Sequence, residues 1–184
     1  MISISMDPRR VNRKIRSLQD GLKPTQVRGA LNAALRSTRV QARKMTTLVL
    51  NLRGADVYKS GARNTNGDLL LMDLASTDNL SGQIVASGKR PGLHKYRARP
   101  YQKGVAARTW KGLGPEYVHH GFIPPSKGGV AFKRVGKPRM PIRVLTGPSV
   151  ADALDPATKQ IQDYAGDRFE VEYLRKLRGL LARG

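Results

Sequence analysis

The chain has no cysteine among its 184 residues. A disulfide framework and a thiolate metal site are therefore excluded, and the fold must depend on packing or oligomerisation. Acidic residues are scarce as well, with 13 Asp and Glu against 34 Lys and Arg. Glu116 is the only acidic residue between positions 89 and 143. This region therefore offers little for paired acid–base catalysis or for a two-metal site.

Long hydrophobic runs are also missing. No apolar run approaches the roughly 20 residues that a membrane-spanning helix needs. The start, from Met1 to Met6, lacks the basic residues and the long apolar stretch of a signal peptide. We expect a soluble protein that is made in the cytoplasm and does not contact a membrane.

Side chains that commonly carry catalysis are few. His94, His119 and His120 are the only histidines, and the adjacent pair would point in opposite directions on a strand, which is poor geometry for one metal ion. Ser149 is not surrounded by a G-x-S-x-G motif, and the glycine loop 126–129 lacks the P-loop spacing. We expect surface or partner-contact histidines, no metal, no cofactor and no enzymatic activity.

Positive charge is the most abundant feature, with a formal net charge of +21. Residues 1–53 carry 12 basic and 2 acidic side chains, and residues 89–143 carry 14 basic and 1 acidic side chain. These two blocks hold all the excess charge. A globular fold does not need such an imbalance, so the sequence indicates a polyanionic partner or environment.

Aromatic residues interleave with the basic residues of the second block. Tyr96, Tyr101 and Trp110 lie among its lysines and arginines, a mixture that suits contact with a nucleic-acid backbone and exposed bases. Aromatic residues on strands more often belong to the core, and we assign Trp110 there. No helix-turn-helix, RRM or zinc-finger signature is present, so only sequence-independent electrostatic binding is predicted.

Residues 1–50 predict two amphipathic helices. Asp7-Pro8 offers an N-cap followed by proline at the first helical position of the first helix. The apolar residues of that helix are Val11, Ile15, Leu18 and Leu22. Thr25 is expected to cap the second, longer helix. Its apolar stripe comprises Val27, Leu31, Ala34, Leu35, Thr38, Ala42, Met45 and Leu48 or Val49.

The second helix also has a basic face opposite the apolar stripe. The residues of that face are Arg28, Arg36, Arg39, Arg43 and Lys44. One interpretation is an ordinary solvated helix face. The other is a face that contacts nucleic acid or an acidic subunit, and the sequence leaves both open.

The middle of the chain reads as β structure. Residues 51–68 are polar and glycine-rich, typical of a loop or hinge, with the strongest turn signal at 64–67. Residues 69–154 then predict a twisted antiparallel sheet or a partly open barrel. The expected strands are 69–74, 80–86, 93–98, 104–110, 117–123, 130–134 and 140–145. Asp78-Asn79 suggests a hairpin between the first two.

Residues 155–184 predict one long amphipathic helix. Its apolar positions are Ile161, Ala165, Phe169, Tyr173, Leu177 and Leu180 or Leu181. The helix packs either on the sheet of its own subunit or on a neighbouring copy. The expected fold is therefore a single α+β domain over residues 1–184.

The segment from Lys133 to Val150 is the most informative motif. Its two strands are joined by a basic turn in which Lys137-Pro138 and Met140-Pro141 favour extended backbone before each proline. Gly147-Pro148 forms a second turn, and Ser149 is placed to cap a short helix over 150–154. The motif residues are Pro141, Ile142, Gly147, Pro148 and Ser149.

This order of elements resembles the minor tail protein Z family of long-tailed bacteriophages, which belongs to the tail completion proteins. The similarity extends through 80–86, 104–110 and 121–132. The resemblance implies a structural virion protein that completes the head-proximal end of the tail and joins it to the head connector. It further implies a homo-oligomeric ring, typically a hexamer, with phage DNA passing through or ending near the lumen. Its expected partners are tail terminator or tube proteins and head-connector proteins.

Under this hypothesis the basic block lines the lumen or contacts other subunits. The candidate residues are Arg97, Arg99, Lys103, Arg108, Lys111, Lys133, Arg134, Lys137 and Arg139. The 51–68 loop is the candidate for reaching a neighbouring ring. The alternative is a free-standing, sequence-independent nucleic-acid-binding protein of ribosome- or nucleoid-associated type. A tail tube or terminator subunit is a third interpretation, within the virion class.

Overall fold

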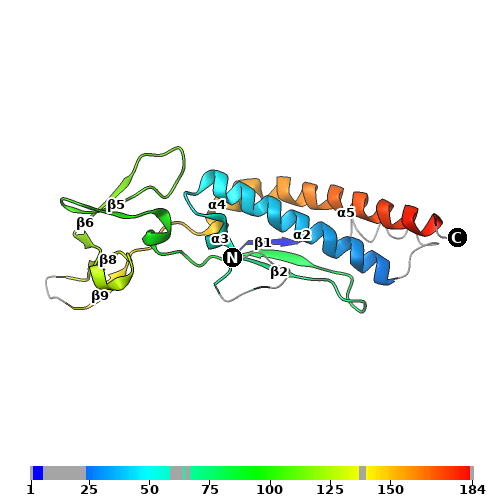
Figure 1. Cartoon of the computed structure of the whole chain (residues 1–184), viewed down its shortest axis with the longest axis horizontal. Coiled ribbons are helices and arrows are strands. Elements are labelled where there is room, and N and C mark those ends of the chain that lie inside the picture. The colour runs from blue at the N-terminus through cyan, green and yellow to red at the C-terminus, as the bar shows by residue number, and fades with distance from the viewer. Residues whose placement is uncertain (1, 6–23, 59–63, 65–66, 137–139, 183–184) are drawn as a thin grey trace.

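The computed structural model describes residues 2–5, 24–58, 64, 67–136 and 140–182. The first predicted N-terminal helix lies outside these residues, as do Lys137 and Arg139. The described chain is α+β and elongated (Figure 1). Two long helices and a small sheet form its body, and further strands form a lobe at the end away from the C-terminus.

The body is built on two antiparallel helices, α2 (Pro24–Val49) and α5 (Thr158–Leu181), which lie side by side (Figure 1). Both were predicted. The stripe of α2 from Val27 to Ala42 is buried, as apolar residues at helical spacing require. Thr25 does not cap this helix, because the helix already begins at Pro24. Proline suits the first turn, where a backbone N–H has no partner within the helix, so its lack of an N–H costs nothing there.

The apolar stripe of α5 is buried at Ile161, Ala165, Phe169 and Tyr173. The ring centroids of Phe169 and Tyr173 lie 5.8 Å apart. It packs against α2 of the same chain. Burial raises the pKa of the Tyr173 hydroxyl.

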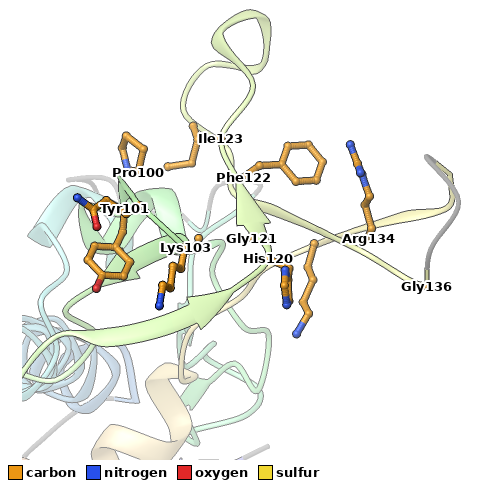
Figure 2. A pocket seen from close by; sticks show the side chains of 12 residues that line it. Pro100, Tyr101, Lys103, His120, Gly121, Phe122, Ile123, Arg134 and Gly136 are labelled. Atoms are coloured by element: carbon orange, nitrogen blue, oxygen red, sulfur yellow. The ribbon is translucent and has the colours of Figure 1, made fainter.

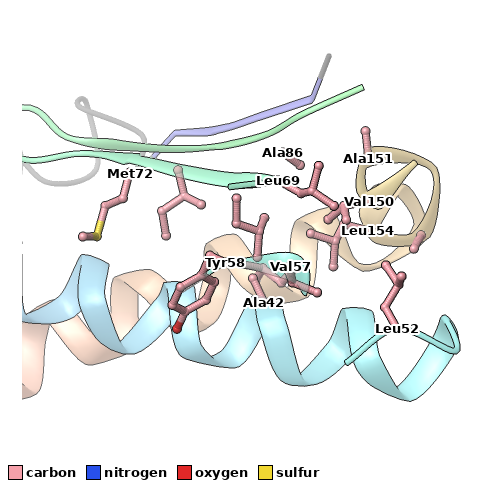
Figure 3. Close-up of a cluster of buried hydrophobic side chains, with 14 of the residues drawn as sticks. Ala42, Leu52, Val57, Tyr58, Leu69, Met72, Ala86, Val150, Ala151 and Leu154 are labelled. Atoms are coloured by element: carbon pink, nitrogen blue, oxygen red, sulfur yellow. The ribbon is translucent and has the colours of Figure 1, made fainter. Parts of the chain in front are cut away.

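The sheet of the body has three antiparallel strands in the order β1-β3-β2. Strands β2 (Leu70–Asp73) and β3 (Gln83–Ala86) form the predicted hairpin, with Leu70 opposite Ala86. Strand β1 (Ile2–Ser5) pairs with the other edge of β3 and was not predicted, although its sequence Ile-Ser-Ile-Ser alternates apolar and polar residues. Alternate residues of β2 and β3 face the helices and form a continuous core with them (Figure 3).

Residues 51–68 were predicted to be a loop or hinge, but their first part contains regular structure. A short helix, α3 (Gly54–Val57), places Val57 in the core, and Leu52 and Tyr58 are buried on either side of it (Figure 3). The Leu69 N–H donates to the Val57 carbonyl at 2.7 Å. An extension toward a neighbouring ring would therefore come from residues 59–67, most of which lie outside the described residues.

The lobe contains two more three-stranded antiparallel sheets. One is β4 (Arg99–Tyr101), β5 (Gly104–Ala107) and β6 (Glu116–His119). The other is β7 (Gly121–Phe122), β8 (Phe132–Arg134) and β9 (Ile142–Val144), with the 3₁₀ helix η2 (Pro125–Lys127) between β7 and β8. The antiparallel strands were expected, but in the described residues they form three separate sheets and no closed barrel.

Two predicted strands of this region are wrong in detail. Residues 93–98 form the 3₁₀ helix η1 (Leu93–Tyr96), which ends at Arg97 with a left-handed φ of 57°. The strand expected over 117–123 is broken at His120, whose φ is 59°. Because a residue with positive φ cannot continue a strand, β6 and β7 belong to different sheets.

The Gly147-Pro148-Ser149 motif joins the lobe to the body. The ring of Tyr96 fills the space beside Gly147, where an added Cβ would lie 2.5 Å from Tyr96 Cε2. The Tyr96 hydroxyl donates to the Pro148 carbonyl at 2.6 Å. Burial, and secondarily the carboxylate of Asp152, raises the pKa of this hydroxyl. Gly147 therefore has a packing role.

Ser149 caps the short helix α4 (Val150–Leu154), as predicted. Its Oγ accepts from the Asp152 N–H at 3.1 Å, while Asp152 Oδ2 accepts from the Ser149 N–H at 2.9 Å. This reciprocal pair is a capping box. The 3₁₀ helix η3 (Asp155–Ala157) then leads directly into α5.

Candidate nucleic-acid interface

The lobe carries the second basic block with almost no opposing charge. Of its 15 charged residues, 14 are basic and Glu116 is the exception. Glu116 Oε1 accepts a hydrogen bond from the Thr109 hydroxyl at 2.8 Å. Two clefts of the lobe, described below, have no acidic side chain among their described lining residues. The electrostatic field of the lobe is therefore positive, which favours polyanions.

The larger cleft, of about 740 Å³, lies between the β4–β5 hairpin and strands β7 and β8. Four cationic or imidazole side chains line it: Lys103, His120, Lys133 and Arg134. Figure 2 shows Lys103 and His120 extending to the same side of the strands, away from Phe122 and Arg134. The cleft thus gathers groups that are distant in sequence.

Exposed aromatic rings lie beside this cleft. Tyr101 lines it, is 46% exposed, and packs against Tyr117, which is 52% exposed, with the ring centroids 4.9 Å apart. Tyr96 and Trp110 do not join them, because Tyr96 is buried and Trp110 packs against the core, as expected for Trp110. The tyrosine pair offers a surface on which an unpaired base can stack.

A smaller cleft of about 330 Å³ is lined by three arginines of the lobe. Arg97, Arg99 and Arg108 line it, together with Asn51 and Tyr96. The structure therefore divides the predicted basic residues into two groups. Lys111 lines neither cleft, and Lys137 and Arg139 fall outside the described residues.

The basic face predicted on α2 is not uniform. Arg36 and Lys44 are exposed, but Arg39 is only 1% exposed and forms a 2.9 Å ion pair with Asp68. The assignment of Arg39 to a solvated or partner-binding face is therefore wrong. Helical spacing placed it next to the apolar stripe, and an acidic partner from a distant segment allowed it to be buried.

The sequence placed His120 on the surface, as the structure does, but did not predict that it lies beside Lys103 or that Tyr117 joins Tyr101. Both follow from tertiary geometry: the break at His120 turns it toward Lys103, and the register of β5 with β6 places Tyr117 opposite Ala106. Over the described residues, no group of three or more His, Asp or Glu side chains is arranged to hold a metal ion. No helix in the described part of the chain is long and apolar enough to cross a membrane.

No family model, no curated protein and no solved structure matches this chain.

Proposed function

We propose that this chain is a structural virion protein that completes the head-proximal end of a phage tail and joins it to the head connector. In this proposal it acts as a homo-oligomeric ring, a hexamer, around or near the DNA. The resemblance of the 130–150 segment to the minor tail protein Z family motivates the identity. The observation that carries the proposal is the concentration of positive charge, with almost no opposing acidic residues, in a lobe at one end of an elongated molecule.

The two-part shape suits such a role. A basic lobe that projects from a helical body meets DNA while the body contacts neighbouring subunits. The body offers exposed apolar residues for these contacts on both long helices, including Leu48 at 72% exposure and Val171 at 51% exposure. In this proposal the lobe binds DNA by sequence-independent electrostatic attraction, and the protein needs no catalytic centre or cofactor.

Charge neutralisation is a requirement of this proposal. Six copies with a net charge of +21 each would bring a formal charge of about +126 into one ring. Repulsion of this size destabilises the assembly unless DNA or acidic subunits neutralise it. We therefore propose that the protein lies at the junction of head and tail, where both DNA and acidic subunits can contact it.

Coexpression with the neighbouring tail genes tests the proposal. The complex is purified in moderate salt with nuclease present, and its mass and its negative-stain class averages are determined. A sixfold ring, or a ring at one end of tail tubes, is the expected result. A protein that stays monomeric and does not bind tails would overturn the proposal.

The exposed Tyr101 and Tyr117 pair beside Lys103 favours a second candidate, a free-standing sequence-independent nucleic-acid-binding protein. Such a protein works as a monomer or dimer. If it covered about 8 phosphates, the log–log slope of affinity against salt would be near −7. Steep salt dependence without ring formation or tail binding would favour this candidate.

A further inference from the structure

We infer that one face of the lobe binds the sugar-phosphate backbone of nucleic acid, in the cleft formed by Lys103, His120 and Lys133. Arg134, the next residue along the chain, belongs to the opposite face and does not take part. The inference deepens the proposed function and rests on it, because that function brings DNA to the lobe. It identifies which of the basic side chains meet the DNA.

Strand register separates Lys133 from Arg134. Lys133 is paired with Gly121 on one side and with Arg143 on the other. Directly paired residues of antiparallel strands share a face of the sheet, and consecutive residues alternate between faces. Lys133 and Arg143 therefore lie on one face of the β7-β8-β9 sheet, and Arg134 lies on the other.

The opposite face is aromatic and aliphatic. Phe122 is paired with Phe132, and their ring centroids lie 6.1 Å apart. The guanidinium of Arg134 lies 5.7 Å from the centroid of the Phe122 ring, within the range of a cation–π contact. Val144, paired with Phe132, continues this face. Arg134 also lines the cleft, but its charge is directed toward the aromatic ring of Phe122 (Figure 2).

Lys103, in the turn between β4 and β5, and His120, between β6 and β7, line the same cleft as Lys133. The His120 N–H donates to the Lys103 carbonyl at 3.0 Å, which holds the two residues side by side. Gly104 permits this approach, because a side chain there would collide with the Val118 carbonyl. Figure 2 shows both side chains extending in the same direction from the strands.

Apolar side chains pack closely against Gly121, one of the residues that line the cleft. A Cβ added at Gly121 would lie 3.1 Å from both Leu145 Cδ1 and Val105 Cγ2, so the backbone is already packed there. Lys103, His120 and Lys133 therefore offer their basic groups to a ligand, beside the neutral polar side chains of Tyr101 and Gln102. The cleft thus offers two ammonium groups and an imidazole, and its lining residues include no acidic side chain. Such groups suit the phosphodiester backbone of nucleic acid and do not distinguish one base sequence from another.

A charge-matched pair of double variants tests the inference. Lys103→Gln with Lys133→Gln removes two positive charges from the cleft. Lys111→Gln with Lys127→Gln removes two from elsewhere in the same lobe, since both residues are exposed and neither lines the cleft. Fluorescence anisotropy with a short DNA duplex and with a single strand of equal length is measured across a salt titration. Thermal unfolding verifies that all variants are folded.

The cleft variant should lose affinity through two phosphate contacts. Each contact contributes about 0.9 to the log–log salt slope on duplex DNA, which corresponds to roughly eightfold in affinity between about 0.1 M and 1 M salt. The cleft variant should therefore show a slope shallower by about 1.8, whereas the control variant should keep the wild-type slope. If Tyr101→Ala lowers the affinity for the single strand more than the affinity for the duplex, exposed bases are an additional part of the ligand.

The outcomes separate this inference from the proposed function. Equal losses in the two double variants would overturn the cleft assignment and leave DNA binding by the lobe as a whole. Loss of tail binding in the cleft variant with unchanged DNA affinity would also overturn it, because the occupant would then be an acidic protein surface. Cleft-dependent DNA binding in a protein that forms no ring would support the cleft and overturn the tail proposal.

Discussion

At the scale of single residues, Arg39 connects helix α2 to strand β2. Its Nε and Nη2 donate to the Leu70 carbonyl at 3.0 and 2.6 Å, and Nη2 also lies 2.9 Å from Asp68 Oδ2. The guanidinium stacks 4.0 Å from the centroid of the Tyr58 ring. One helical arginine thus contacts three residues of the following segments.

Arg39→Met should lower the free energy of unfolding by about 3–5 kcal/mol, because it removes the cation of a buried 2.9 Å ion pair. Urea denaturation followed by circular dichroism measures the change. The matched control is Arg36→Met on the same helix, where the side chain is exposed and the expected change is within about 0.5 kcal/mol. Adding Asp68→Asn to Arg39→Met should recover part of the loss. Equal effects of the two single substitutions would contradict this role of Arg39.

At the scale of secondary-structure elements, helix α4 depends on its capping box. The hydrogen bond from the Ser149 backbone N–H, followed by the one with the Ser149 side chain, lowers the pKa of the Asp152 carboxyl. A carboxyl whose pKa is lower in the folded state stabilises the fold above its ordinary pKa. That stabilisation is lost as the pH falls through the folded-state value.

Asp152→Asn should therefore destabilise the protein at neutral pH, and the difference from wild type should shrink as the pH falls into the carboxyl titration range. Urea denaturation at a series of pH values measures this difference. Ser149→Ala should cost about 1 kcal/mol through loss of the cap. Asp78→Asn, in the exposed turn between β2 and β3, serves as the control for the change in charge. A difference for Asp152→Asn that stays constant with pH would argue against the capping role of the carboxylate.

At the scale of the whole molecule, charge and shape are coupled. The lobe projects from the end of the helical body (Figure 1). In the proposed ring, the basic lobes of several subunits would lie close together. Exposed charges interact over a Debye length of about 10 Å at 0.1 M salt, so subunits within that range repel one another. The balance between isolated subunits and rings should consequently depend on counterions.

Addition of a short DNA duplex at low salt should increase the fraction of rings, because it neutralises the repelling lobes. Sedimentation velocity of the purified protein measures this fraction. Raising the salt concentration without DNA should act in the same direction, and an uncharged polymer of similar size is the control. If DNA and salt both left the oligomeric state unchanged, charge repulsion would not be what limits assembly.

Much of the fold follows from local patterns in the sequence. Apolar spacing predicted α2 and α5, alternating β-favouring residues with turn signals predicted the β2–β3 and β8–β9 hairpins, and Ser149 predicted the cap of α4. These signals work because each element buries one face, and its own residues determine which face is apolar. The charge count likewise located the basic block before any fold was known.

Distant contacts decided the rest. Burial of Arg39 depends on Asp68, the left-handed turn at His120 divides one expected strand between two sheets, and pairing with β3 makes four residues at the start of the chain a strand. The sequence by itself determined the helices, the hairpins and the amount of positive charge, because these depend on neighbours along the chain. Only the tertiary structure decided that Lys133 shares a cleft with Lys103 while Arg134 faces away, because strand register and sheet packing join segments that are separate in sequence.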